Sequence, residues 1–130
     1  MFIKNLNECE EFTANDGCRI RELLHPENDT VNLPFSIAIA TVDATGRSYR
    51  HKLNLTEIYY ILEGTGRIHI DSECATVKVG DVIVIPAGAS QWIENPDNKK
   101  LVFAAIVSPP WNAMDDVRLD AEDKMGNVNI

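Results

Sequence analysis

A series of short strand-like segments, separated by turn residues, limits more than any other feature what this chain can fold into. Runs rich in valine, isoleucine, tyrosine and phenylalanine end repeatedly at glycine, proline, aspartate or asparagine, which favour turns over continued strands. The only helical pattern is one short turn, expected within residues 5–12. Such a series predicts an all-β sandwich or small barrel. The predicted strands are residues 18–24, 33–42, 47–53, 57–62, 67–70, 75–79, 82–85, 91–94 and 101–107.

The length of the chain predicts a single domain. At 130 residues it can close one hydrophobic core but not two. The pattern of strands divides it into an N-terminal arm at 1–30 that adds a strand to the barrel, the barrel itself at 31–111, and an acidic C-terminal tail at 112–130. The tail has few apolar residues and no clear period, so we expect a surface arm or partial disorder there.

The charge of the chain excludes two classes of partner. The net charge is −8, and the basic residues are scattered among acidic ones. A nucleic acid or an anionic membrane would need a basic stripe, so neither is expected as a partner. No apolar run is long enough to span a membrane, and residues 1–7 lack the order of a signal peptide, which predicts a cytoplasmic protein. Three cysteines without CxxC spacing predict reduced thiols.

The first stretch with side chains capable of chemistry is RHKLNLTEIYYILEGTG at 50–66. Side chains alternate between the two faces of a strand, so His51 and Leu53 share one face, and Glu57 opens the next strand. This arrangement brings an imidazole and a carboxylate to adjoining strand ends. Tyr59 lies on the same strand face as Glu57 and is a candidate for lining a pocket beside it.

The second stretch is GDVIVIPAGASQWIEN at 80–95, where two turns enclose a buried strand and lead to Gln91. Together the two stretches resemble the two sequence motifs of the cupin family, over about residues 31–111. Leu53 and Gln91 stand where those motifs have histidines. Gly46 lies one residue closer to the first motif than expected. The matching positions are His51, Glu57, Gly64, Gly80, Pro86, Gly88 and Asn95.

The resemblance implies a double-stranded β-helix, a small jelly-roll barrel that binds a metal or a small molecule in its interior. A typical cupin holds a divalent metal through three histidines and a glutamate. Carried over to this chain, that set leaves His51 and Glu57 as metal ligands and Gln91 as a weaker one through its amide oxygen, with Fe, Mn, Ni, Cu or Zn as the candidate ion. His51, Glu57 and Tyr59 are the candidate catalytic residues. Small cupins usually pair, so the resemblance also implies a homodimer.

A second alignment of the first motif remains open. It would place Arg50 and Lys52 in the histidine positions and point two cations into the barrel. We prefer the alignment with His51 and Leu53 inward, because it leaves the charged side chains to solvent.

Three functions stay in competition at this stage. The first is a metal-assisted enzyme of the isomerase, dioxygenase or lyase type, acting on a small molecule. The second is a metal-free sugar epimerase or isomerase that uses His51 and Glu57 as an acid–base pair. The third is a non-catalytic or regulatory module that holds a small organic ligand, because a fold does not by itself determine a function.

Overall fold

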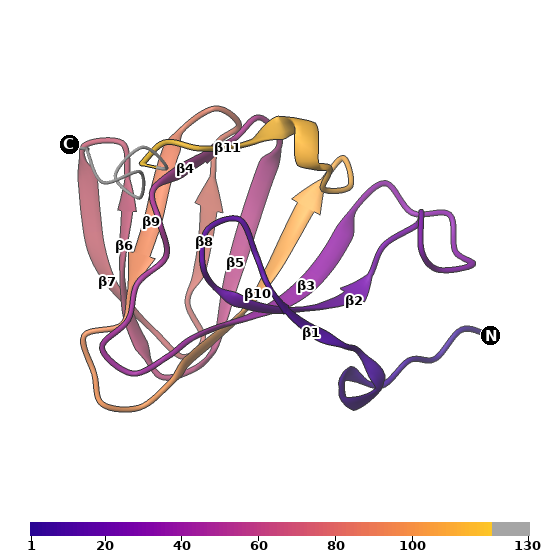
Figure 1. The fold of residues 1–130 in the computed structure, drawn as a ribbon, viewed down its shortest axis with the longest axis horizontal. Coiled ribbons are helices and arrows are strands. Elements are labelled where there is room, and N and C mark those ends of the chain that lie inside the picture. Colours follow the sequence, from indigo (N-terminus) through magenta and orange to yellow (C-terminus); the bar gives the residue numbers. More distant parts are fainter. Residues whose placement is uncertain (121–130) are drawn as a thin grey trace.

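The structure, a computed structural model, describes residues 1–120 and consists of two antiparallel sheets that enclose one core (Figure 1). Its strands are β1 Glu11–Thr13, β2 Arg19–Leu24, β3 Ser36–Val42, β4 His51–Leu53, β5 Thr56–Glu63, β6 Thr65–Ile70, β7 Glu73–Lys78, β8 Val82–Ile85, β9 Ser90–Glu94, β10 Leu101–Ser108 and β11 Asp116–Arg118. One sheet has the order β1-β2-β3-β10-β5-β8 and the other β11-β4-β9-β6-β7. The predicted all-β jelly-roll barrel is confirmed.

The core forms because the strands alternate between residues that face the other sheet and residues that face outward. Strand β10, paired with β3 on one side and β5 on the other, shows this along its length. The core cluster joins buried residues of β10 to Ile61 of the neighbouring strand β5 and to Ile93 of β9, which lies in the opposite sheet. Each large side chain buried in this way stabilises the fold by about 1.5–3 kcal/mol. The buried residues of β10 are Leu101, Phe103, Ala105 and Val107.

Both ends of the described chain join the sheets. Strand β2 matches the predicted strand 18–24 and pairs with β3, and β1 extends the same sheet. Phe12, expected at the end of a helical turn, pairs instead with Ile20 in β1, because the ladder to β2 satisfies its backbone. The turn itself is a 3-10 segment, Leu6–Glu8, capped by Asn5. Strand β11, which the sequence pattern did not predict, pairs with β4.

The strand predicted at residues 47–53 is shorter in the structure, because the side chain of Ser48 takes over one of the backbone hydrogen bonds that a continuous strand would make. Of residues 47–53 only β4, His51–Leu53, forms a continuous strand. At Ser48 the backbone N–H donates to the Ile93 carbonyl at 2.9 Å, and the Ser48 hydroxyl accepts from the Ile93 N–H at 2.9 Å. The side chain thus replaces a carbonyl that regular strand pairing would have supplied.

Two further expectations concern cysteines and membrane spans. Cys9, Cys18 and Cys74 are free thiols. Neither helical segment of residues 1–120, Leu6–Glu8 or Ala113–Asp115, has the length and hydrophobicity that crossing a membrane requires.

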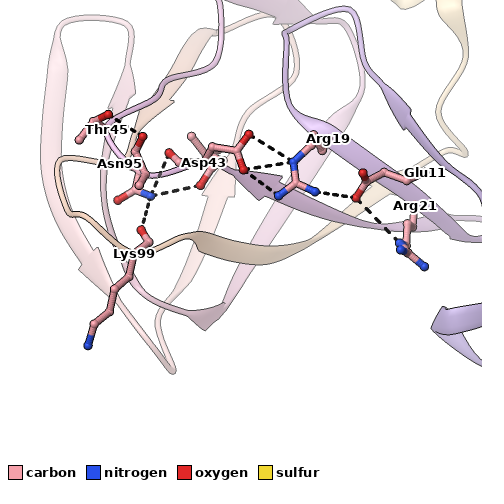
Figure 2. A network of polar contacts seen from close by, with 9 residues as sticks. Glu11, Arg19, Arg21, Asp43, Thr45, Asn95 and Lys99 are labelled. Atoms are coloured by element: carbon pink, nitrogen blue, oxygen red, sulfur yellow. Dashed lines mark hydrogen bonds and ion pairs between the residues drawn. The ribbon is translucent and has the colours of Figure 1, made fainter.

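Arg19 ties the N-terminal arm to the barrel (Figure 2). Its guanidinium group donates to Glu11 of β1 at 2.8 Å and to Asp43, just after β3, at 2.7 Å. These ion pairs lie at the surface, where each contributes at most about 1 kcal/mol. Their effect is to hold three successive strands in register at one end of the sheet.

Asn95, a motif position, is a structural residue in this fold (Figure 2). Its side chain is 1 % exposed, and its amide nitrogen donates to the carbonyls of Val42, Asp43 and Lys99 at 3.1, 3.2 and 2.6 Å. Gly64 closes the neighbouring turn at φ +84°, where a Cβ atom would lie 2.5 Å from the carbonyl oxygen of Lys100. Both motif residues therefore hold the loop that leads into β10.

We expect the substitution Asn95→Asp to lower the free energy of unfolding by at least about 2 kcal/mol, because a buried carboxylate would replace the amide that donates to three backbone carbonyls. Urea denaturation at pH 7 measures the change. The matched control is Asn98→Asp, which adds the same charge at an exposed position of the same loop. Equal stability of the two variants would contradict the structural role of Asn95.

Candidate functional site

A cavity of about 220 Å³ lies between the two sheets, next to the N-terminal arm and β11. Strands from both sheets and both flanking segments supply its wall, so the site exists only in the closed fold. One part of the wall is apolar and includes Phe12, Ile20, Ile37, Leu53, Val107 and Trp111. The other carries titratable side chains: Asp16, Glu22, His25, His51, Glu57 and Asp116.

His51 reaches the cavity from β4 with its ring oriented by the backbone. The ring is 4 % exposed, and Nδ1 lies 3.2 Å from the carbonyl oxygen of Tyr49. That oxygen can only accept, so Nδ1 carries the proton and Nε2 is the lone-pair nitrogen of the neutral ring. Nε2 lies 4.0 Å from Oδ2 of Asp16. The nearest charged partner of the imidazole is thus Asp16, a residue that the sequence motifs did not indicate.

Glu57 faces the cavity from β5, in the opposite sheet, and its carboxyl group is held in the neutral form. The side chain is 7 % exposed, and Oε1 has no hydrogen-bond partner. Burial raises the pKa of Glu57 to about 8, and the negative charges of Asp16 and Asp116 add to the shift. The amide of Gln91 opposes it, although Nε2 of Gln91 makes no well-formed hydrogen bond. At neutral pH Glu57 is therefore mostly protonated.

Gln91 and Tyr59 form a buried pair of their own. The Tyr59 hydroxyl donates to Oε1 of Gln91 at 2.9 Å, and the two side chains are 3 % and 1 % exposed, respectively. Tyr59 also packs its ring against Phe103, with ring centroids 4.3 Å apart. Neither residue lines the cavity. The amide oxygen considered as a metal ligand faces Tyr59, and the catalytic role of Tyr59 stays a prediction.

The orientation of β4 follows the preferred alignment of the first motif. His51 and Leu53 are buried, whereas Lys52 is half-buried and Arg50 is exposed. Leu53 is 2 % exposed and lines the cavity with an apolar surface. The second histidine position of the motif is therefore filled by hydrocarbon that faces the interior.

The donor atoms around the cavity do not fit a tightly held divalent metal. Residues 1–120 contain no group of three or more His, Cys, Asp or Glu side chains placed to hold one ion. His51 and Glu57 are two donors, and Gln91 already accepts a hydrogen bond through its oxygen. A catalytic zinc site, by comparison, has three protein ligands. The ligand set predicted from the resemblance is thus incomplete in this chain.

Several residues of the site lie outside the motifs and escaped the sequence analysis. Asp16 sits in a tight turn, where Oδ1 accepts from the Cys18 N–H at 3.0 Å and Oδ2 is left facing His51. The Asp16-Gly17 pair in the sequence is typical of a turn, but it does not report the position of that turn over the cavity. Asp116 belongs to β11, a three-residue strand that is too short to show the alternation of polar and apolar residues by which strands are predicted. Trp111, which follows β10, donates from its Nε1 to Asp116 at 3.0 Å.

Comparison with known proteins gives likenesses in sequence and in fold. The family model described as Cupin domain matches residues 38–107. An uncharacterized protein of Methanocaldococcus jannaschii is 38 % identical over 110 residues, covering 84 % of this chain and 87 % of that protein. A predicted oxalate decarboxylase from Thermotoga maritima has a TM-score of 0.72 at 27 % identity, over 83 % of this chain and 99 % of that one. The oxalate decarboxylase of Bacillus subtilis, which has Mn(II) centres, has a TM-score of 0.77 at 23 % identity, over 88 % of this chain and 31 % of that one.

The raised pKa of Glu57 predicts how stability depends on pH. In the unfolded chain the carboxyl group has a pKa near 4.5, whereas in the folded protein the pKa is about 8. Between these values the unfolded state releases the proton and the folded state keeps it, so stability falls as pH rises from about 4.5 to 8 and then levels off. The fall due to this group is on the order of 4–5 kcal/mol.

We therefore expect Glu57→Gln, which cannot ionise, to lose much less stability than the wild type between pH 5 and pH 9, as measured by urea denaturation in the presence of EDTA. Glu63→Gln removes an exposed carboxylate from the same strand and should keep the wild-type slope. A Glu57→Gln profile parallel to that of the wild type would show that Glu57 is charged in the folded protein.

Proposed function

This chain belongs to the cupin domain family, and from that premise we propose that the cavity between its sheets binds a small organic molecule through His51 and Glu57, without a resident divalent metal. The volume of about 220 Å³ lies below the roughly 300–1,000 Å³ of pockets for drug-sized ligands, so the ligand is small. The apolar wall packs against the carbon skeleton of the ligand, and His51 and Glu57 orient its polar groups.

The observation that carries this proposal is the unused hydrogen-bonding capacity of Glu57. A buried polar atom without a partner costs about 1–3 kcal/mol, and native proteins retain few of them. Oε1 of Glu57 is such an atom, on a residue that lines a cavity. A ligand with a polar group at this point would remove that cost on binding.

The two side chains offer complementary chemistry from opposite sheets. Protonated Glu57 has an O–H donor, and Nε2 of His51 is an acceptor when the ring is neutral. A ligand hydroxyl between them could donate to one and accept from the other. The same pair also favours a catalytic variant of the proposal, because a carboxyl group with a pKa of about 8 can both give and take a proton near neutral pH. That variant is an acid–base isomerase.

The metal-assisted alternative is supported by relatives rather than by this site. The Bacillus subtilis oxalate decarboxylase has Mn(II) centres. At 23 % identity, its likeness to this chain is a likeness of fold alone. Here the second histidine position is Leu53, and the oxygen of Gln91 is bonded to Tyr59. We accordingly assign no step of binding or catalysis to a metal ion.

Metal analysis tests the proposal directly. We expect protein without a polyhistidine tag, incubated with excess Mn²⁺, Fe²⁺, Ni²⁺, Cu²⁺ or Zn²⁺ and then desalted, to retain far less than one ion per chain. One equivalent of any of these ions, lost in both His51→Ala and Glu57→Ala, would overturn the metal-free proposal and restore the metal-assisted one.

Ligand binding is tested in EDTA, so that metals play no part. We expect some members of a library of small polar organic molecules to raise the Tm of the wild type, since a ligand stabilises the state that binds it. Those shifts should disappear in His51→Ala and Glu57→Gln. They should persist in His69→Ala, a histidine outside the cavity that stacks on Trp92. Shifts that survive both cavity substitutions would place the ligand elsewhere.

A further inference from the structure

The charge on the wall of the cavity is one-sided. Four carboxyl groups line it, those of Asp16, Glu22, Glu57 and Asp116. The only basic side chains among the described residues that line it are two histidines, His25 and His51. No lysine or arginine belongs to that set, and the chain as a whole carries a net charge of −8. The field inside the cavity is therefore set by Asp16, Glu22 and Asp116, since Glu57 is mostly protonated at neutral pH.

Two of these carboxyl groups have oxygen atoms without a partner. Glu57, more than nine-tenths buried, has Oε1 unpaired, and Asp116 has Oδ1 buried and unpaired. Oδ2 of Asp116 accepts from Nε1 of Trp111 at 3.0 Å, which fixes the orientation of the carboxylate. Two acceptor atoms thus remain in the wall without a well-formed hydrogen bond, and the only described donor that acts on either is the amide of Gln91, near Glu57.

The neighbouring arginine does not fill this role. Arg118 lies next to His51 across the β4–β11 ladder, but its guanidinium carbon lies 3.2 Å from the centroid of the Tyr49 ring. Its Nε lies 3.5 Å from Oδ1 of Asp120, and Arg118 does not line the cavity. The carboxyl groups of the wall are left without a cation from their own chain among residues 1–120.

We propose that the ligand of this cavity is a small organic cation, an ammonium group on an apolar body about the size of one ring, with Asp116 and Glu57 as acceptors for its N–H groups. The inference rests on the proposed function of the cavity and names the class of its ligand. An ammonium group has only donors, and a carboxyl group accepts through its carbonyl oxygen even when it is protonated, so both Asp116 and Glu57 can accept from it. The aromatic ring of Trp111, held beside Asp116, adds a surface on which a cation is attracted.

The same charges select against small dicarboxylates. Oxalate, the compound in the names of several relatives, would bring two negative charges beside Asp16 and Asp116. Like charges in a partly apolar cavity repel more strongly than in water. We infer that this chain and those relatives differ in the charge of the ligand they take.

A matched series of probes tests the charge preference: benzylamine, benzyl alcohol and benzoate, with oxalate as a fourth compound. The first three have similar size and carry a positive, zero and negative charge at pH 7. Isothermal titration in 150 mM salt with EDTA measures the dissociation constants. We expect benzylamine to bind at least about tenfold more tightly than benzyl alcohol, and benzoate and oxalate to show no binding.

Two substitutions separate the site from the general charge of the protein. Asp116→Asn keeps an acceptor for Trp111 and removes the charge, and we expect it to weaken benzylamine binding at least about tenfold. Glu73→Gln removes one charge from an exposed position of β7 outside the cavity and should leave binding unchanged. Equal losses in the two variants would mean attraction to the surface and would overturn the proposal.

The outcomes also separate this inference from the proposed function. Benzyl alcohol or benzoate binding as tightly as benzylamine, with the binding lost in Glu57→Gln, would overturn the cation preference and leave the ligand-binding cavity in place. Failure of all four probes to bind would count against both the preference and the cavity as a binding site.

Discussion

Burial of a carboxyl group without a cation is the constraint around which the interior of this barrel is arranged. Glu57 opens a strand whose next inward residues belong to the core, so it cannot turn to solvent without breaking the ladder. Burial raises the pKa of this group to about 8, so near neutral pH it takes up a proton, which turns an acceptor-only group into one that also donates. The polarity of the cavity follows from that change.

The residues at the two altered motif positions are consistent with this state of Glu57. Leu53 presents hydrocarbon to the cavity and adds to the desolvation that keeps Glu57 protonated. Gln91 is neutral and buried, and its oxygen accepts from the hydroxyl of Tyr59. Both positions thus carry uncharged side chains, and neither adds a charge to the environment of Glu57.

The barrel could be predicted from the sequence because its strands alternate and its turns carry glycine, proline and asparagine at fixed spacing. The inward direction of His51 and Glu57 followed from the same alternation. Asp16 and Asp116 could not be placed, because a turn and a three-residue edge strand carry no period that reports their distance from His51 or Glu57. The raised pKa of Glu57 could not be predicted either, because it depends on burial and on the charges of Asp16 and Asp116, which the fold brings near it.

Most of the cavity wall comes from outside the family's shared region. Twelve of its eighteen lining residues lie before residue 38 or after residue 107, among them Asp16, Trp111 and Asp116. The barrel itself supplies the scaffold and the His51–Glu57 pair, while the two flanking segments decide shape and charge. Substitutions in these segments can thus alter what the cavity accepts while the motif residues stay unchanged. Barrels of common descent can in this way diverge in ligand while their motifs stay recognisable, and the motif alone is a poor guide to what any one of them holds.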